Sequence, residues 1–212
     1  MCDNFPPYIK IILLGNPEVG KRAIISSYIG STYEEYNSST IGANYSEKII
    51  KKDNKEYELN IWDTAGQEKF HSLGKHFFKG AYIVCLVYDI TNQESFESLK
   101  TIWYPDLLKD GEKYIILAVV GNNGELYESD YLVDENKAKV FADEIGATFH
   151  IVSAKNGDGI EKLFNTLIDR YLSPEFNSKL EEMLNFKGGN MKSLKLTNVN
   201  SENELIKKKE FC

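Results

Sequence analysis

Apolar runs alternate with amphipathic stretches along most of the chain, and this alternation is the feature that most restricts its fold. Runs typical of buried strands are YIKIILLG, AYIVCLVYDI, YIILAVVG and TFHIVSA, while YSEKIIKK and YELNIWD are typical of two strands joined by a turn. Helical patterns lie between them: KRAIISSYI, NQESFESLKTIWYPDLL, ENKAKVFADEIG and GIEKLFNTLIDRYL. Such alternation produces βαβ units and a largely parallel sheet covered by helices. The sequence therefore predicts an α/β fold whose ligand sites lie at the carboxyl ends of its strands.

Composition is typical of one globular domain and argues against nucleic-acid binding, a disulfide framework and a membrane span. The chain has 212 residues, 42% of them hydrophobic, and its net charge of −7 is the opposite of what nucleic-acid binding requires. Its three cysteines are odd in number and Cys85 lies in an apolar run, so we expect a reducing compartment rather than a disulfide framework. No apolar run approaches about 18–20 residues and the first residues lack a signal-peptide pattern, so we expect a cytoplasmic protein.

The composition changes after Leu172, which suggests a boundary. We expect a domain over residues 1–173 and a polar tail over residues 174–212. SPEFNSKLEEMLNF, at the start of this tail, is compatible with one short helix. The last residues, about 25 in number, are polar with little periodicity, which is typical of a flexible segment.

The stretch GNPEVGK has the spacing G-x-x-x-x-G-K and lies between a predicted strand and a predicted helix. Glycines let the backbone wrap around phosphate groups, and the loop amides and the helix N-terminus favour negative charge. Lys21 is placed to reach the β- and γ-phosphates of a nucleotide. The alternative is a tight glycine turn with a solvent-exposed lysine. The predicted nucleotide contacts of this loop are Gly15, Asn16, Pro17, Glu18, Val19, Gly20, Lys21, Arg22 and Ala23.

Two further segments carry residues suited to nucleotide chemistry. Asp63 ends the predicted strand YELNIWD, where it would hold a metal ion through water. In the following DTAGQE, the Gly66 amide would bind a terminal phosphate and Gln67 would orient an attacking water. Thr40, in SSTIGANY, would offer its hydroxyl to both the metal and the γ-phosphate. The alternative for these residues is an ordinary structural role in a loop, a turn or a helix cap.

The stretches GNPEVGK, STIGANY, WDTAGQEKFHSL and VSAK resemble, in order and spacing, those of small GTPases of the Ras superfamily. ELNIWDTAGQEKF, FFKGAYIVCLVYDIT and QESFESLKTIWYPDL look most like the Rab branch, and the resemblance covers about residues 8–172. It implies the three-layer fold of the P-loop NTPases, with a six-stranded, mixed but mostly parallel sheet and five helices. It also implies two switch segments, residues 33–45 and 64–78, that the γ-phosphate orders and that effectors, exchange factors and activating factors read.

The base-recognition motif departs from the N-K-x-D of the family. Here it reads GNNGEL, so that Glu125 replaces an aspartate that accepts two hydrogen bonds from guanine, and Asn123 is too short to replace the lysine. The alternative is an ordinary turn at Asn123 and Gly124 that carries the base site away. The resemblance assigns the base pocket to Tyr33, Asn122, Asn123, Glu125, Ser153, Ala154 and Lys155.

Arg22 is the second departure, because the family has a serine or threonine there whose hydroxyl binds Mg²⁺. Arginine has no lone pair to offer a metal, so its side chain must swing away from the ion or displace it. This leaves Thr40 and Asp63 as the expected ligands of a weakened Mg²⁺ site. The resemblance therefore predicts a Rab-like switch in vesicle traffic that hydrolyses GTP to GDP slowly, with Gln67 as the catalytic residue. One alternative is a pseudo-GTPase that serves as a partner-binding module, and another is a purine-nucleotide binder with relaxed base choice.

The chain ends IKKKEFC, with Cys212 as its last residue. Rab-like proteins often carry prenylated cysteines at this end, usually two, whereas Cys212 stands alone. One lipid together with Lys207, Lys208 and Lys209 would attach the protein peripherally to the cytosolic face of an endomembrane. The alternative is an unmodified, solvated tail.

Overall fold

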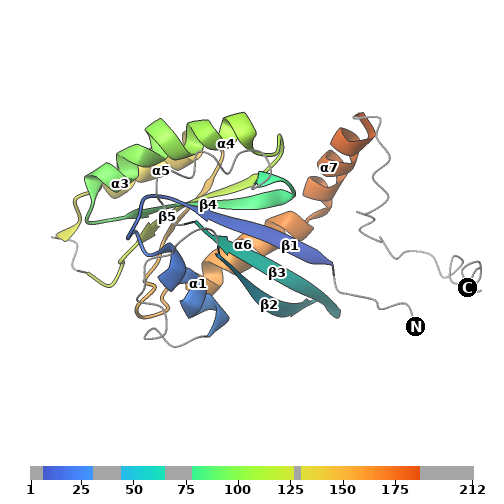
Figure 1. Ribbon diagram of the computed structural model, residues 1–212, viewed down its shortest axis with the longest axis horizontal. Helices are drawn as coiled ribbons and strands as arrows, with labels where there is room; N and C mark the ends of the chain where they lie inside the picture. Colours follow the sequence, from blue (N-terminus) through green and yellow to red (C-terminus); the bar gives the residue numbers. More distant parts are fainter. Residues whose placement is uncertain (1–6, 31–43, 65–77, 127–129, 187–212) are drawn as a thin grey trace, which may run out of the picture.

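The computed structural model describes residues 7–30, 44–64, 78–126 and 130–186 (Figure 1). A six-stranded sheet in the order β2-β3-β1-β4-β5-β6 forms its middle layer. β2 runs antiparallel to β3, and the other neighbouring pairs are parallel. The strands are β1 (Tyr8–Leu14), β2 (Asn44–Lys52), β3 (Lys55–Asp63), β4 (Ala81–Asp89), β5 (Ile116–Asn122) and β6 (Thr148–Ile151).

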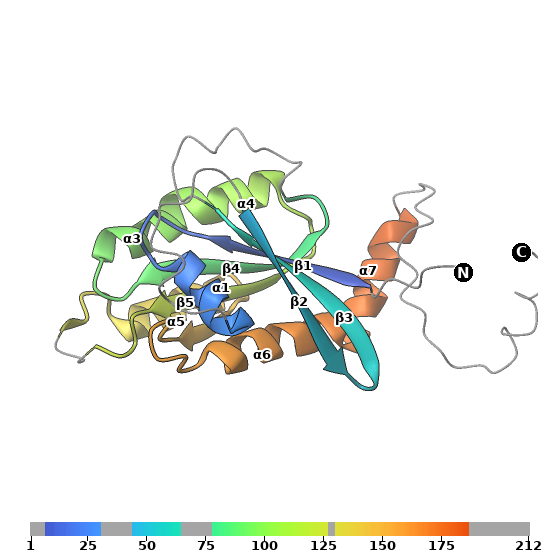
Figure 2. The same cartoon turned by 60° about the horizontal axis from the view of Figure 1, so that its bottom comes forward.

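Helices pack on both faces of this sheet (Figure 2). Side chains alternate along β1, so that Ile11 and Leu13 join the core under α1 and α6, whereas Ile12 and Leu14 join the core under α3, α4 and α5. This arrangement confirms the predicted three-layer α/β class. The helices are α1 (Lys21–Ile29), α3 (Gln93–Ser98), the π-helical η3 (Leu99–Trp103), α4 (Tyr104–Asp110), α5 (Glu135–Glu144), α6 (Ile160–Leu172) and α7 (Pro174–Phe186).

The strand and helix patterns of the sequence explain the two cores. From Ala81 to Tyr88 every residue of β4 is buried, because both faces of this central strand are covered. α6 instead buries one stripe at helical spacing, which includes Ile160, Phe164 and Leu167, and exposes the opposite face. Among the described residues, no helix combines the length and the apolarity that a membrane span requires.

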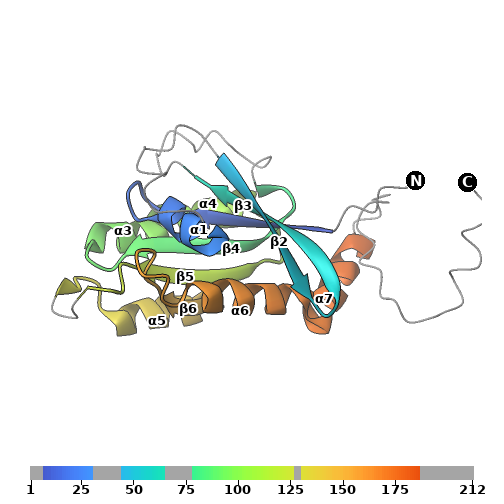
Figure 3. The ribbon, with the colours of Figure 1, turned by 90° about the horizontal axis from the view of Figure 1, so that it is seen from below.

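α7 forms where SPEFNSKLEEMLNF predicted a helix, and its first turns pack against the domain. Phe176 and Leu180 are buried in the core shared with α6. The Phe176 ring stacks on Tyr114 with ring centroids 4.8 Å apart and lies 5.4 Å from Tyr171. Figure 3 shows α7 at the end of the sheet opposite the loop that precedes α1. The domain limits of residues 1–173 and 174–212 stay a prediction.

Truncating Phe176 tests whether α7 is part of the domain. Phe176→Ala is expected to lower the free energy of unfolding by about 3–4 kcal/mol, because a buried ring is removed and a cavity remains. Urea unfolding of the full chain measures this value. Leu108→Ala serves as the control, because Leu108 is 65% exposed and the same kind of truncation there should change stability by about 0.5 kcal/mol or less. An unchanged unfolding midpoint in Phe176→Ala would show that α7 contributes nothing to the domain.

Candidate functional site

The loop between β1 and α1 has the backbone of a phosphate cradle. Glu18 (φ 64°) and Gly20 (φ 87°) adopt left-handed conformations, and Gly15 has a φ of 150°. A Cβ at Gly15 would lie 2.1 Å from the carbonyl oxygen of Val87, and one at Gly20 would lie 2.1 Å from Asn122 Nδ2. Gly20 is the N-cap of α1 and offers no side-chain acceptor, so no capping side chain satisfies the first amides of the helix. Those amides therefore suit an anion.

Lys21 folds back over this loop rather than into solvent. Its Nζ donates hydrogen bonds to the carbonyl oxygens of Gly15 at 2.9 Å and Asn16 at 2.7 Å, and the residue is only 5% exposed. Burial lowers the pKa of Lys21 to about 8, although the negative charge of Asp63 opposes this shift. The alternative of a solvent-exposed lysine is therefore wrong, and a cation lies where nucleotide phosphates would enter the loop.

The end of β3 brings Asp63 close to this cation. In the parallel pairing Asp63 lies opposite Leu13 of β1, directly before the phosphate loop, and it is 5% exposed. The next residue, Thr64, donates its hydroxyl to the carbonyl oxygen of Leu13 at 3.0 Å, which fastens the strand end to β1. Arg22 is partly buried in the first turn of α1. The structure thus places Asp63 where a metal ligand is predicted, while its role as a ligand stays a prediction.

Asn122 connects the two described loops of the predicted base site with the phosphate loop. Its Nδ2 donates to the carbonyl oxygen of Val19 in the phosphate loop, and its Oδ1 accepts from the Ala154 N–H, each at 3.1 Å. Because Asn122 is 2% exposed, this amide acts as a buried crosslink. Ser153 is also buried, and its Oγ accepts from the Asn156 N–H at 3.0 Å, which shapes the turn that leaves Lys155 exposed.

The Asn123–Gly124 turn forms, but it stays beside the predicted base site. Asn123 has a φ of 73°, and its carbonyl oxygen accepts from the Leu126 N–H at 3.1 Å. Gly124 N–H donates to the carbonyl oxygen of Val152 at 2.9 Å, which holds the turn next to the Ser153–Ala154 loop. A Cβ at Gly124 would lie 2.8 Å from the Ile151 side chain, so glycine is needed for this close approach.

Glu125 places a carboxylate oxygen without a partner in this turn. Its side chain is partly exposed, yet Oε2 is buried and has no hydrogen-bond partner within the part of the chain that the structure describes. Buried polar atoms are rarely left unpaired, because desolvation without a replacement hydrogen bond costs about 1–3 kcal/mol. A ligand with N–H donors would satisfy this oxygen once the Glu125 side chain turned to expose it.

Several predicted site residues lie outside the described residues: Tyr33, Thr40, Gly66, Gln67 and Cys212. Pro17 and Glu18 are exposed, Val19 is buried, and Ala23 is partly buried at the start of α1. The structure also adds contacts that the sequence did not predict, since Asn16 bonds through its side chain to Ser98 and Trp103. In the sequence Trp103 is only one apolar residue of a helical pattern, and no local signal indicates a partner 87 residues away.

Comparison with known proteins agrees with this geometry. A model of the Ras family matches residues 10–173, a range that includes the phosphate loop, the end of β3 and both base-site loops. The Ras-related protein Rab-31 of Rattus norvegicus is 39% identical over 166 residues, which cover 78% of this chain and 84% of the relative. The Rab-31 proteins of Mus musculus and Homo sapiens match with the same identity and coverage. These matches give no support to the pseudo-GTPase alternative.

Proposed function

The chain belongs to the Rab branch of the Ras superfamily of small GTPases, and we propose from this premise that it acts as a guanine-nucleotide switch in vesicle traffic. Small GTPases of this family bind GTP, GDP and Mg²⁺ and hydrolyse GTP. The proposal concerns how this chain does so with Arg22 in its phosphate loop and Glu125 in its base loop.

The single observation that supports guanine as the base is the Glu125 carboxylate, whose Oε2 accepts no hydrogen bond from the described residues and which lies in the turn that Gly124 holds beside the Ser153–Ala154 loop. Guanine presents two neighbouring donors, its ring N–H and its amino group, to an acceptor at this position. Adenine presents an acceptor nitrogen there, which would face the carboxylate unfavourably, because an ionised carboxylate is acceptor-only. Since Asn122 links this loop to the phosphate loop, a base held by Glu125 and phosphates held by Lys21 would belong to the same ligand.

For the phosphate end we propose that the loop amides and Lys21 hold the nucleotide, and that Gln67 positions the attacking water. The residues present fit Mg²⁺ only in part: Asp63 lies buried beside the loop, whereas the Arg22 side chain supplies no oxygen. When bound, Mg²⁺ would neutralise phosphate charge, and Thr40 and Asp63 would hold it. With one oxygen ligand missing, we expect hydrolysis to be slow.

We further propose that residues 33–45 and 64–78 contact effectors, exchange factors and activating factors, as the resemblance implies. Lipidation of Cys212, assisted by Lys207, Lys208 and Lys209, would attach the protein to the cytosolic face of an endomembrane. Both proposals rest on the sequence alone.

Substitution of Glu125 tests the proposed base choice. Wild-type protein is expected to bind GDP more tightly than ADP, and Glu125→Ala to lose about tenfold in GDP affinity, because hydrogen bonds to a charged group contribute about 1.5–3 kcal/mol. Competition by GDP and ADP against a fluorescent guanine nucleotide measures both constants. Glu144→Ala, an exposed glutamate of α5, serves as the control and should bind like wild type. Equal affinity for GDP and ADP in the wild type would contradict the proposed function, and an unaffected Glu125→Ala would contradict the contact.

A further inference from the structure

A π-helical segment interrupts the helix that contacts the phosphate loop. Backbone angles stay right-handed helical at Ser98, Leu99, Trp103 and Tyr104, so α3, η3 and α4 form one continuous helix. The Tyr104 N–H donates to the carbonyl oxygen of Leu99, five residues earlier rather than four. Pro105 follows, and proline has no N–H to donate and crowds the carbonyl four residues before it in a regular α-helix. The wider π turn relieves this conflict.

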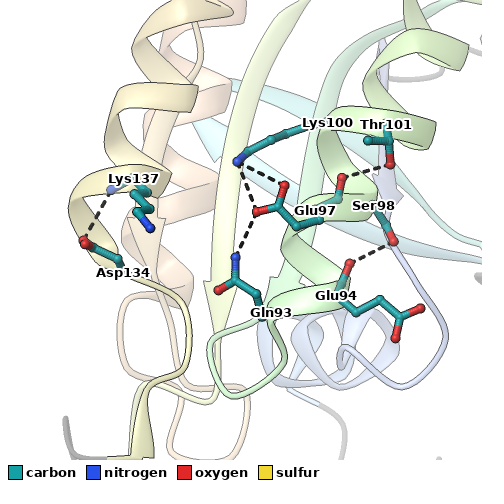
Figure 4. Close-up of polar contacts among 8 residues, drawn as sticks. All are labelled: Gln93, Glu94, Glu97, Ser98, Lys100, Thr101, Asp134 and Lys137. Carbon is teal, nitrogen blue, oxygen red and sulfur yellow. Dashed lines mark hydrogen bonds and ion pairs between the residues drawn. The ribbon is translucent and has the colours of Figure 1, made fainter.

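Two hydroxyl groups, one just before this segment and one within it, bond to helix carbonyls, as Figure 4 shows. Ser98 Oγ donates to the carbonyl oxygen of Glu94 at 2.9 Å, and Thr101 Oγ1 donates to that of Glu97 at 3.0 Å. Thr101 is exposed, whereas Ser98 is buried and its Oγ also accepts from Asn16 Nδ2 at 3.0 Å. Ser98 and Thr101 are thus a matched pair in one helix, and the Ser98 hydroxyl has this additional bond to the phosphate loop.

The π segment lets Ser98 and Trp103 reach the phosphate loop together. In an α-helix with 3.6 residues per turn, residues five apart point about 140° away from each other. With hydrogen bonds between residues i and i+5, the later residue instead lies above the earlier one. Trp103 Nε1 accordingly donates to Asn16 Oδ1 at 2.8 Å while Asn16 Nδ2 bonds to Ser98. Both ends of the Asn16 amide are therefore held by the same helix.

Asn16 also contacts the proposed phosphate-binding lysine, because its backbone carbonyl oxygen accepts a hydrogen bond from Lys21 Nζ at 2.7 Å. Fixing the Asn16 side chain therefore helps to fix the position of Lys21. We propose that Ser98, Trp103 and Asn16 form a latch that keeps the phosphate loop in its binding shape and slows the release of nucleotide. Ser98 and Trp103 are positioning residues, since they act through Asn16. The inference rests on the proposed function, because it concerns a nucleotide held in this loop. A preorganised loop lowers the cost of binding, and such gains appear mainly in the dissociation rate.

Release of fluorescent GDP from the full chain, followed by stopped flow, tests the latch. Trp103→Phe removes the indole N–H but keeps an aromatic ring, and Ser98→Ala removes the hydroxyl that accepts from Asn16. Each variant is expected to release GDP about fivefold faster, as the loss of one hydrogen bond predicts. Thr101→Ala loses a comparable hydroxyl bond in the same helix and should release GDP at the wild-type rate. Equal acceleration in Thr101→Ala and Ser98→Ala would overturn the latch.

A double-mutant cycle separates the latch from a general loss of helix packing. If Trp103 acts through Asn16, the double variant Asn16→Ala, Trp103→Phe should release GDP no faster than the faster single variant. Rates that multiply would overturn the proposal. The chain has 2 tryptophans, Trp62 and Trp103, so a Trp62→Phe background isolates the emission of Trp103. That emission is expected to change on GDP release, and Asn16→Ala is expected to abolish the change.

The outcomes distinguish this inference from the proposed function. A wild-type protein that binds no GDP would overturn the proposed function and the latch with it. A wild-type protein that binds GDP, with unchanged release in Trp103→Phe and Ser98→Ala, would overturn the latch alone.

Discussion

Replacing Lys21 by methionine is expected to lower the affinity for GDP by about two orders of magnitude or more. Methionine has a similar length but no charge, so the loop amides would face the phosphates without the buried cation. Charge-assisted hydrogen bonds contribute about 1.5–3 kcal/mol each, and every 1.4 kcal/mol is tenfold in affinity. Losing two such bonds between the Lys21 ammonium and the phosphates therefore lowers the affinity by at least this amount. Titration with fluorescent GDP measures it. Lys162→Met removes the same charge from an exposed position of α6 and should bind like wild type.

The pH dependence of the same titration gives an independent check on Lys21. Burial lowers its pKa to about 8. Phosphate binds the protonated form, so affinity should fall as the pH rises through about 8 in the wild type, and this fall should be absent in Lys21→Met. Folding stability should respond in the opposite sense. Above about pH 8 the lysine loses its proton in the folded protein but keeps it in the unfolded chain, so the free energy of unfolding rises with pH. Identical pH profiles of affinity for the two proteins would contradict the role of Lys21.

Replacing Arg22 by serine is expected to raise the affinity for Mg²⁺ about a hundredfold and to speed GTP hydrolysis. Serine would restore a direct oxygen ligand at the start of α1, where arginine offers none. Loss of a group that merely orients a metal ligand costs 10–100-fold in affinity, so gaining a direct ligand should produce at least a change of that order. In the wild type we expect a water to fill the missing position at reduced affinity, because Mg²⁺ retains waters readily.

The release rate of GDP with and without excess chelator measures this effect, and two further variants isolate its cause. Arg22→Ala removes the cation without supplying a ligand, so it should gain less Mg²⁺ dependence than Arg22→Ser. Arg170→Ser makes the same change in the last turn of α6 and should behave like wild type. Equal chelator sensitivity in wild type and Arg22→Ser would show that this position does not govern the metal.

Features encoded in adjacent residues were predictable from the sequence. The strands and the amphipathic helices follow from periods of two and of 3.6 residues, and the phosphate loop follows from Gly15 and Gly20 at fixed spacing. Both glycines have positive φ values, and Val87 and Asn122 approach them so closely that a Cβ would not fit. The periodicity and the glycine spacing are local features of the sequence, so they are visible before the chain is folded, whereas the contacts with Val87 and Asn122 are not.

Contacts between distant residues were decided by the tertiary structure. The burial of Lys21 depends on how its side chain folds over the loop, and the pairing of β3 with β1 brings the charge of Asp63 near it. The sequence left open whether the Asn123–Gly124 turn would carry the base site away, and the bond from Gly124 to Val152 holds the turn in place.

The hydrogen bond from Trp103 to Asn16 shows most clearly what the sequence could not predict, since it joins residues 87 positions apart. By itself, the sequence determined the kinds of element, their order and the phosphate loop. The tertiary structure decided which side chains meet across those elements. Periodicity tells which face of a helix is apolar, but a hydrogen bond between two elements also depends on strand order, register and the local winding of the helix, and these arise only when the whole chain packs.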